Sequence, residues 1–350
     1  MKGEEKRITR RGFLATTLKI GAGIIAYPVL RGLLTTKSPY RVFSGEKVLA
    51  ENRVLIRLAS PFKTGHILCD AGEKFKELIE GESKGRIEVQ VQPGAGSEEE
   101  INDWCKEGRV EMQATGGRPL EVFAPQYFFF NAPYVMKDFE HFMRVWEGSL
   151  GEQARELVER DGKMMYLGIV YRGLRQMTSN KPIYTPDDVK GLKLRLPTVA
   201  TWIAVWKGMG AEPVPVPLPD LYNSLKTGRA EASEGDLPQI DSFKLYEVQS
   251  YLTITNHLVQ TGGILINKPF FDRLSKLDQE LILRASKEAT DWANQKIKTG
   301  EGELTVALQK KGMQVVIPDA EAFRVKGKPA VEELFKKEWP VTTWENVLKQ

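Results

Sequence analysis

The 350-residue sequence has few cysteines, which excludes two classes of stabilising site. Its two thiols, Cys69 and Cys105, cannot build a disulfide framework or a four-ligand structural zinc site. Both lie in segments with helical periodicity, so we expect buried free thiols. A single disulfide is the alternative if the protein resides in an oxidising compartment.

Histidine is equally scarce, with three in the chain. His141 is expected at the surface or in a groove of a long helix, and His257 is expected to satisfy a buried turn. His66 precedes a helix in a loop where a ligand has room to bind. For each, a local structural role is favoured over catalysis, and we predict no metal site.

Catalytic motifs are absent as well. The sequence contains no H-E-x-x-H, G-x-S-x-G or C-x-x-C. Gly94-Ala95-Gly96 begins like a dinucleotide-binding loop, but three glutamates follow Ser97, and they would repel a pyrophosphate at a helix N-terminus. We therefore predict neither an enzyme nor a bound cofactor.

The chain also lacks a long uninterrupted hydrophobic run. The nearest candidate, residues 13–34, is interrupted by Lys19 and Arg31 and follows the pair Arg10-Arg11. This pattern is typical of a twin-arginine export signal, so residues 1–40 are predicted to direct the protein to the periplasm or another extracytoplasmic location. A short amphipathic helix is the alternative. No A-x-A cleavage site is visible, so the segment is either cleaved elsewhere or retained as a membrane anchor, and no cysteine lies nearby to carry a lipid.

Positive charge is concentrated in that segment. The chain has a formal net charge of +4, but residues 1–40 hold eight basic and two acidic residues, leaving 42 basic and 44 acidic residues in the remainder. A nucleic-acid-binding surface needs a basic face in the folded part. We therefore predict no nucleic-acid partner.

Strand-like and helix-like segments alternate from Arg53 onward, and the length suits two domains. This alternation predicts βαβ units and an α/β fold with mixed, mostly parallel sheets. The expected strands cover residues 54–58, 87–91, 110–114, 165–170, 192–196, 213–217 and 262–266. Long helices are expected over 138–160 and 278–298, with shorter ones near 68–80, after 97, and through Trp202 and Trp206.

An ordered set of fragments then points to one family. These fragments are residues 172–183 (RGLRQMTSNKPI), 186–197 (PDDVKGLKLRLP), 209–215 (MGAEPVP), 221–228 (LYNSLKTG), 246–249 (YEVQ) and 255–257 (TNH). Together they resemble the solute receptors of tripartite ATP-independent periplasmic (TRAP) transporters. The similarity is colinear over this region and continues more weakly from about Val54 to Glu338.

The resemblance implies a two-domain, periplasmic-binding-protein-like fold with a long domain-spanning helix and a central ligand cleft. It places residues 50–172 and 261–300 in one domain and 173–260 and 301–350 in the other. It also implies a receptor that closes on a small organic carboxylate and delivers it to a membrane permease. The alternatives are a receptor for an ATP-driven importer or for a sensor system. A monomer is favoured over a dimer, and the identity of the acid and the involvement of a metal ion stay open.

The family's ligand anchor is an arginine in the G-L-K-x-R-x-P run, which is Arg195 here, and a second arginine, Arg175, lines the site. A planar guanidinium presents a bidentate fork that matches a carboxylate, which lysine does not. Arg195 ends an otherwise apolar strand, where a buried charge is costly unless a partner arrives. A strand-end arginine paired with a protein carboxylate is the alternative interpretation.

Further site positions follow from the same resemblance, with departures. Sialic-acid-binding members have an arginine at Arg118, preceded by an acid that is Thr115 here. They have Asn where this chain has Thr198 and an aromatic residue where it has Leu218. The family's D-G-Q-E-N-P run, whose Asn contacts the ligand, reads E-A-S-E-G-D here; it supplies the candidates Glu234, Gly235 and Asp236. These departures argue against sialic acid as the ligand.

Three candidate wall residues complete the prediction. Trp202 and Trp206 lie four apart on one helical face, so core packing is the simpler interpretation, with contact between Trp202 and an apolar part of the ligand as the alternative. Phe62 and His66 lie in the loop after the first strand, which borders the cleft in this family.

Overall fold

The computed structural model describes residues 53–350. In the first half of the described chain, the elements are β1 (Val54–Ser60), α1 (Ile67–Glu82), β2 (Ile87–Pro93), α2 (Glu98–Glu107), β3 (Met112–Thr115), α3 (Arg118–Phe123), the 3-10 helix η1 (Pro125–Asn131), α4 (Phe139–Glu147), α5 (Ser149–Gly162), β4 (Met164–Ser179), η2 (Pro186–Val189) and β5 (Lys193–Leu196). The predicted signal, residues 1–40, lies outside the described residues.

The second half continues with α6 (Ala200–Gly208), β6 (Glu212–Pro215), η3 (Leu218–Asp220), α7 (Leu221–Lys226), β7 (Ala232–Asp236), α8 (Leu237–Ser242), η4 (Leu245–Glu247), β8 (Tyr251–Thr253), β9 (Val259–Asn267), α9 (Lys268–Asp272), α10 (Lys276–Lys310), β10 (Gln314–Val316), α11 (Ala320–Lys337) and α12 (Trp344–Leu348). None of the helices in residues 53–350 is both long and apolar enough to cross a lipid bilayer.

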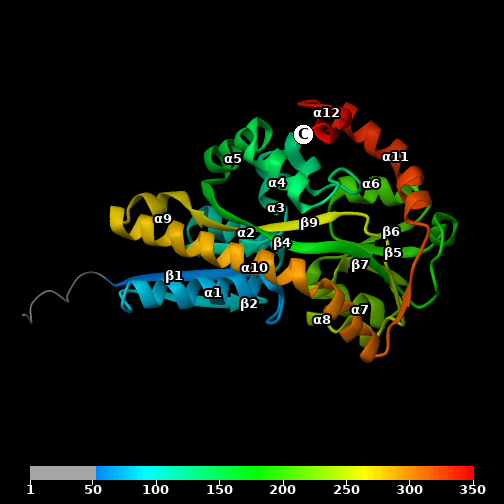
Figure 1. Ribbon diagram of the computed structural model, residues 1–350, viewed down its shortest axis with the longest axis horizontal. Helices are drawn as coiled ribbons and strands as arrows, with labels where there is room; N and C mark the ends of the chain where they lie inside the picture. Colours follow the sequence, from blue (N-terminus) through cyan, green and yellow to red (C-terminus); the bar gives the residue numbers. More distant parts are fainter. Residues whose placement is uncertain (1–52) are drawn as a thin grey trace, which may run out of the picture. The chain divides into compact units, whose positions relative to one another are not determined.

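A mixed sheet organises these elements, with helices packed on both sides (Figure 1). Its main strand order is β2-β1-β3-β9-β4-β7-β5-β6, and β8 and β10 extend it from β4. Five of the nine strand pairings are parallel: four lie at the two ends of this order, and the fifth joins β8 to β10. The other four, which involve β4 or β9, are antiparallel. The predicted α/β class is confirmed. The long strand β4 pairs with β9 along its first part and with β7 and β8 along its last part, so it belongs to both halves.

The first βα units form where the sequence predicts them. Helix α2 begins with a capping box between Ser97 and Glu100 and ends at Gly108, which adopts the left-handed conformation (φ 73°). The three glutamates that argued against a pyrophosphate site instead occupy the first turn, where the helix dipole favours negative charge. The second half repeats the pattern, since β5 pairs in parallel with both β6 and β7.

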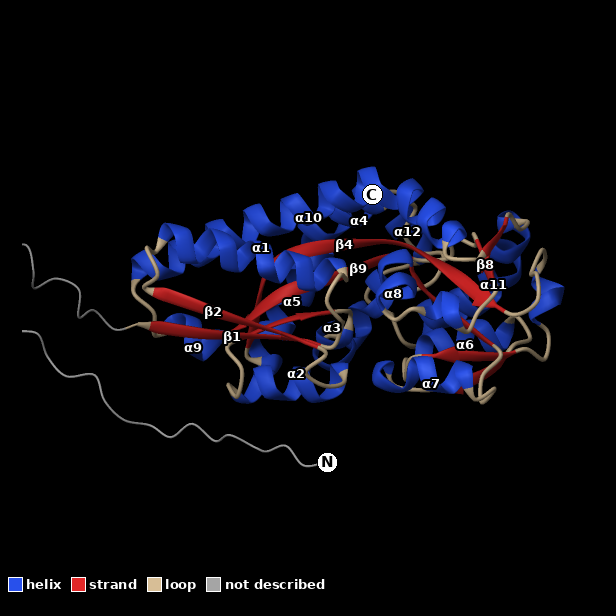
Figure 2. Ribbon diagram, turned by 90° about the horizontal axis from the view of Figure 1, so that it is seen from below, coloured by secondary structure: helices blue, strands red, loops and turns tan. Residues whose placement is uncertain are grey.

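Helix α10 is longer than predicted: it spans 35 residues, against the expected 278–298. It packs against α1 and β4 in one half and α8 in the other, so it runs along both halves of the sheet (Figure 2). Its buried face includes Leu281, Ala285 and Ala289, whereas Trp292 is exposed. The predicted spanning helix is therefore present.

The predicted single helix over 138–160 is wrong. The chain forms α4 and α5, separated at Gly148, whose backbone is extended (φ −80°, ψ −176°). A side chain at Gly151 would place its Cβ 1.9 Å from the carbonyl oxygen of Trp146, so the chain turns tightly here. Hydrophobic periodicity runs through both helices and so conceals the break.

The histidine and cysteine predictions have mixed outcomes. Cys69 and Cys105 are buried free thiols, as expected. His141 is fully buried, which corrects its predicted surface position, because its Nε2 lies 2.8 Å from the carbonyl oxygen of Val347 in the returning C-terminal segment. His257 satisfies its own turn as predicted, with Nδ1 2.8 Å from the Thr255 hydroxyl.

Candidate functional site

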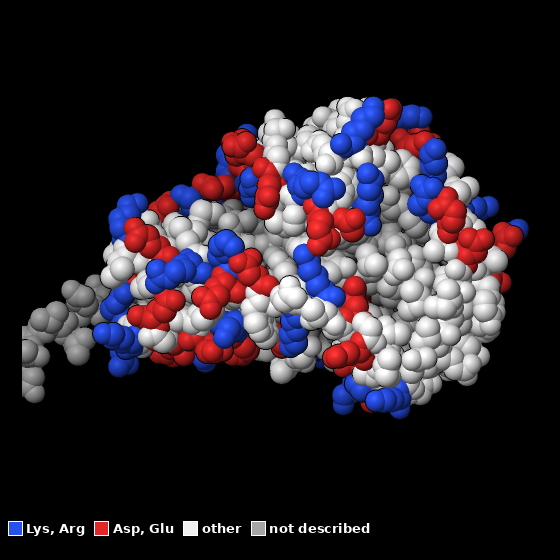
Figure 3. Space-filling view, viewed as in Figure 1, with Lys and Arg blue, Asp and Glu red and all other residues white. Residues whose placement is uncertain are grey.

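A pocket opens between elements of the two halves of the sheet. On one side lie the loop after β1 and the starts of α2 and α3; on the other lie the β5–α6 connection and η3, with β4 and β9 behind. It is lined by Phe62, Glu98, Glu99, Gly117, Arg118, Glu121, Phe128, Arg172, Arg175, Arg195, Pro197, Thr198, Val199, Trp202, Pro217, Leu218, Gln239 and Gln260. In Figure 3, acidic and basic side chains are interspersed over the face shown rather than gathered into one patch.

Arg195 is the most deeply buried cation of the pocket, with 1% of its surface exposed. It sits on β5, and its Nε and Nη2 both donate to the backbone carbonyl of Val216, at 3.0 and 2.7 Å. No carboxylate within residues 53–350 comes within 4 Å of it. Burial lowers the pKa of Arg195 to about 10, still well above neutral, so the guanidinium remains charged.

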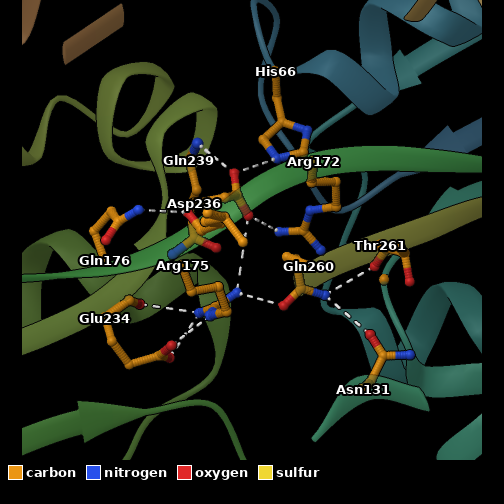
Figure 4. Close-up of polar contacts among 12 residues, drawn as sticks. His66, Asn131, Arg172, Arg175, Gln176, Glu234, Asp236, Gln239, Gln260 and Thr261 are labelled. Carbon is orange, nitrogen blue, oxygen red and sulfur yellow. Dashed lines mark hydrogen bonds and ion pairs between the residues drawn. The ribbon is translucent and has the colours of Figure 1, made fainter. Parts of the chain in front are cut away.

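Arg175, on β4, is by contrast saturated with protein partners. Its Nε and Nη2 bind the Glu234 carboxylate, and its Nη1 donates to the side-chain oxygen of Gln260 at 3.0 Å (Figure 4). It also lies against the face of the Trp202 ring, 4.7 Å from the centroid. Its Nη1 also lies 3.8 Å from Oδ2 of Asp236.

A third arginine, Arg172, lines the pocket and was not predicted. Its Nη2 lies 2.6 Å from Asp236, and its guanidinium stacks over Phe62 at 4.3 Å. Its buried Nε has no partner among the described residues. Arg172 opens the first fragment of the family resemblance, so the sequence did offer it as a candidate. Side chains alternate between the two faces of a regular strand, however, and this alternation puts residues 172 and 175 on opposite faces.

Behind the arginines lies a buried layer of charge. Asp236 accepts from Arg172 and from the backbone N–H of Gln239, and His66 Nε2 lies 3.4 Å from it (Figure 4). Glu234 pairs with Arg175, and Nε2 of His257 lies 3.1 Å from its carboxylate. Burial alone would raise the pKa of Glu234, but the guanidinium of Arg175 outweighs it and lowers the pKa to about 2. Burial likewise opposes the charge of Asp236, but the guanidinium of Arg172 lowers the pKa of that carboxyl, so both carboxylates are ionised. Burial lowers the pKa of both histidines, so they are neutral.

At Gly235, the absence of a side chain leaves space that another side chain fills. A Cβ at this position would lie 2.6 Å from Nε2 of Gln239, so glycine leaves room for that side chain. Gln239, on α8, lines the pocket, and its buried Nε2 has no partner among the described residues. The amide that the family resemblance placed at position 235 is thus presented from position 239, which was not predicted.

The opposite wall carries carboxylates from α2 and α3. Glu98 accepts from the backbone N–H of Gly116 at 2.9 Å, and Glu99 accepts from the Thr198 hydroxyl at 2.7 Å. The second contact joins α2 to the β5–α6 connection across the pocket. Arg118 pairs with Glu121 at 2.9 Å. Burial raises the pKa of Glu99, but the Thr198 hydrogen bond and the helix backbone lower it below its ordinary value.

The eleven predicted site residues therefore divide into two groups. Those on the pocket lining are Arg195, Arg175, Arg118, Thr198, Leu218, Trp202 and Phe62. Those in the layer behind it are Glu234, Gly235, Asp236 and His66. Trp202 does not stack on Trp206; its indole N–H donates to the carbonyl of Asn131 at 2.5 Å, while Trp206 packs edge-on to His257.

Comparisons with known proteins agree on one family. The model of bacterial extracellular solute-binding proteins, family 7, matches residues 59–338. The chain is 29% identical to the sialic acid-binding periplasmic protein SiaP of Vibrio cholerae, over 79% of this chain and 87% of that protein. It is 30% identical to a solute-binding protein of Roseobacter denitrificans, over 83% of this chain and 94% of that protein.

Solved structures extend these similarities to the fold. The crystal structure of the Roseobacter denitrificans protein, a TRAP periplasmic solute-binding protein with bound L-galactonate, matches with a TM-score of 0.79 and 28% identity, over 85% of this chain and 99% of that one. A TRAP periplasmic solute-binding protein from a Polaromonas species, bound to D-erythronate, matches with a TM-score of 0.78 and 25% identity, over 85% and 97%.

Proposed function

Because the chain belongs to family 7 of the bacterial extracellular solute-binding proteins, we propose that it captures a small organic carboxylate in this pocket for a TRAP transporter. The carboxylate binds Arg195, and the loaded receptor delivers it to the membrane permease. The protein acts as a binding protein and not as an enzyme, in a periplasmic or equivalent location that residues 1–40 direct it to reach.

The observation that carries this proposal is the environment of Arg195. A buried guanidinium in a medium of low polarity is costly unless an anion accompanies it. Here its hydrogen bonds go to one neutral carbonyl, and no carboxylate of the described chain lies within 4 Å. A ligand carboxylate would supply the missing charge and could accept from the remaining Nη1, as a charge-assisted bond. Arg175, which also lines the pocket, adds a second positive charge near the anchor.

The ligands of similar proteins support the same chemistry. The Vibrio cholerae relative binds sialic acid, and the Roseobacter denitrificans and Polaromonas structures hold L-galactonate and D-erythronate. All three ligands are carboxylic acids. We propose the shared carboxylate, and not the remainder of any of these molecules, as the feature that this chain recognises.

Closure of the two halves is the proposed mechanism of capture. Residues on opposite sides of the pocket are already in contact at Glu99–Thr198 and Trp202–Asn131. Exclusion of water from the ion pair strengthens it, and the ligand favours closure by binding the closed state more tightly. The receptor is proposed to work as a monomer.

A thermal-shift and calorimetric screen of residues 41–350 against hydroxy, keto, sugar and dicarboxylic acids tests the proposal. A ligand at a hundred times its dissociation constant stabilises the native state by about 2.7 kcal/mol, so a true ligand raises the melting temperature. Arg195→Ala should abolish that shift, while the exposed Arg273→Ala, a matched loss of one arginine, should preserve it. Unchanged affinity in Arg195→Ala would overturn the anchor assignment.

A further inference from the structure

Arg172 lines the pocket with most of its hydrogen-bonding capacity unused. It projects from β4, and 3% of its surface is exposed. Within residues 53–350, only its Nη2 has an acceptor, the Asp236 carboxylate at 2.6 Å, and neither its Nη1 nor its buried Nε has one. Arg175 by contrast uses Nε, Nη1 and Nη2 on Glu234 and Gln260. Arg172 therefore has more donors to offer a ligand than Arg175 has.

Asp236 is a fixed counterion for Arg172. Its Oδ2 lies 2.6 Å from Nη2 of Arg172 and 3.8 Å from Nη1 of Arg175. Its Oδ1 accepts from the backbone N–H of Gln239 at 2.9 Å, where it caps α8, and lies 3.4 Å from Nε2 of His66 (Figure 4). The residue is fully buried and held on both oxygens, so the charge of Arg172 is already neutralised before a ligand arrives.

A hydrogen-bond acceptor lies beside the unused Nη1. A Cβ on Gly116 would be 3.0 Å from Nη1 of Arg172 and 2.6 Å from Oε1 of Glu98, so these two atoms are neighbours. The ion pair of Arg172 is nevertheless with Asp236 and not with Glu98. The backbone N–H of Gly116 donates to Oε1 of Glu98 at 2.9 Å and fixes the carboxylate there. Arg172 and Glu98 both line the pocket, which thus has a donor and an acceptor side by side.

A hydroxyl group matches this pair of neighbours. A hydroxyl oxygen accepts from a guanidinium while its proton is donated to a carboxylate, and both bonds are charge-assisted. A carboxylate has no proton to donate to Glu98. It would also bring a further negative charge close to Glu98 and Asp236 in a buried setting, where repulsion is weakly screened.

Building on the proposed function, we infer that Arg172 and Glu98 together bind a hydroxyl group of the captured acid. Asp236 is then a specificity-determining residue, because by neutralising Arg172 it disfavours a second carboxylate at this position. Arg172 and Arg195 line one pocket, and Arg175 lies near each of them: burial lowers the pKa of both arginines, and the charge of Arg175 lowers both further. One small acid can therefore contact the carboxylate anchor and the hydroxyl subsite together.

The test compares acids of equal carbon number. D-Erythronate, butyrate and meso-tartrate form a four-carbon set, and L-galactonate, hexanoate and galactarate form a six-carbon set; each holds a hydroxy acid, the plain acid and the dicarboxylic acid. Isothermal titration calorimetry on wild type should show, in at least one set, the hydroxy acid binding at least about tenfold more tightly than the other two. Equal or tighter binding of a plain or dicarboxylic acid in both sets, or no binding of either hydroxy acid, would overturn the inference.

A double variant tests Arg172 without leaving a buried charge unpaired. Arg172→Met with Asp236→Asn removes one charge of each sign. The hydroxy acid should lose about tenfold in affinity, while the plain acid should change by less than about twofold. A purely structural role of the pair would weaken both acids alike and leave their ratio unchanged. Arg160→Met with Asp161→Asn makes the same exchanges in an exposed pair on α5, and it should leave both affinities unchanged.

Two single variants test the flanking carboxylates. Asp236→Asn keeps an oxygen that caps α8 but leaves Arg172 with an unneutralised positive charge. The affinity for meso-tartrate or galactarate should then rise at least about fivefold, and no rise for either would contradict the role of Asp236. Glu98→Gln replaces a charged acceptor by a neutral one, so it should weaken the hydroxy acid a few-fold without changing the plain acid.

The inference and the proposed function fail in different ways. If Arg195→Ala abolishes binding of every acid while the Arg172→Met, Asp236→Asn double variant keeps the wild-type ratio of hydroxy acid to plain acid, the receptor proposal stands and the hydroxyl subsite is wrong. If acids bind wild type and Arg195→Ala equally, the anchor itself is wrong. Circular dichroism spectra and melting temperatures establish that the variants are folded.

Discussion

Arg172 and Arg175 lie three residues apart on β4, yet both approach the same oxygen of Asp236, at 2.6 and 3.8 Å. In a regular strand they would point to opposite faces. The register with β9 shifts between Tyr171 and Gly173, and Gly173 adopts φ +98°, so a bulge turns the second arginine to the side of the first. The placement of both arginines beside Asp236 depends on this irregularity.

Gly173→Ala should therefore disrupt both stability and binding. The new Cβ would lie 2.5 Å from Oε1 of Glu301 and would hold an unfavourable φ, so we expect a loss of about 1–3 kcal/mol in the free energy of unfolding, measured by urea denaturation. Gly191→Ala is the matched control: its φ is also positive (+69°), but nothing lies within 4 Å of the new Cβ, so its loss should be smaller. Equal losses would refute a role for the crowding at Gly173.

Glu234 predicts a specific acid dependence of stability. Its pKa is lowered from 4.5 to about 2 in the folded protein, so its ionised form stabilises the fold above pH 4.5. That contribution is lost as the pH falls from about 4.5 towards 2, because the unfolded state then binds the proton more readily. Chemical denaturation across this range should show the decline. Glu234→Gln should be less stable at pH 7, by about 3–5 kcal/mol, because it leaves Arg175 without its carboxylate, and its own decline should be shallower.

The family resemblance expects a side-chain amide at position 235, and this chain has it at position 239. A double substitution tests whether the two positions share one space. Gly235→Asn alone should destabilise the protein by about 1–3 kcal/mol, because its Cβ meets the Gln239 amide at 2.6 Å. Adding Gln239→Ala should recover part of that loss. Melting temperatures of the two single variants and the double variant form the cycle, and strictly additive losses would show that the two side chains do not compete for one space.

Thr198→Val should weaken ligand binding more than it weakens the unliganded fold. The hydroxyl donates to Glu99 across the pocket, at 2.7 Å, and the valine keeps the shape without the donor. Loss of one such bond costs about 0.5–1.5 kcal/mol, or roughly a two- to tenfold loss in affinity. Calorimetry measures the affinity, and a fall in melting temperature of the unliganded protein without any change in affinity would contradict a role in closure.

The sequence was informative where regular periodicity or a family motif governs the structure. Alternating strands and helices predicted the α/β class, and the G-L-K-x-R-x-P run placed Arg195 on the pocket lining. The break at Gly148 was missed because the hydrophobic pattern continues across it. Arg172 and Gln239 were missed because their positions depend on a bulge and on the absence of a side chain at Gly235, which neither periodicity nor motif matching detects.

Arg195 is oriented by the carbonyl of Val216, and that carbonyl is fixed in turn by the bond from the Val216 amide to Leu196. Every residue type except proline supplies both of these backbone groups, so replacing the side chain at position 216 with any other residue leaves the two bonds available. The anchor is thus insulated from the side-chain changes that alter the rest of the pocket. A lineage of such receptors can exchange one acid for another by replacing residues such as Glu98 or Gln239, without having to rebuild the group that holds the carboxylate.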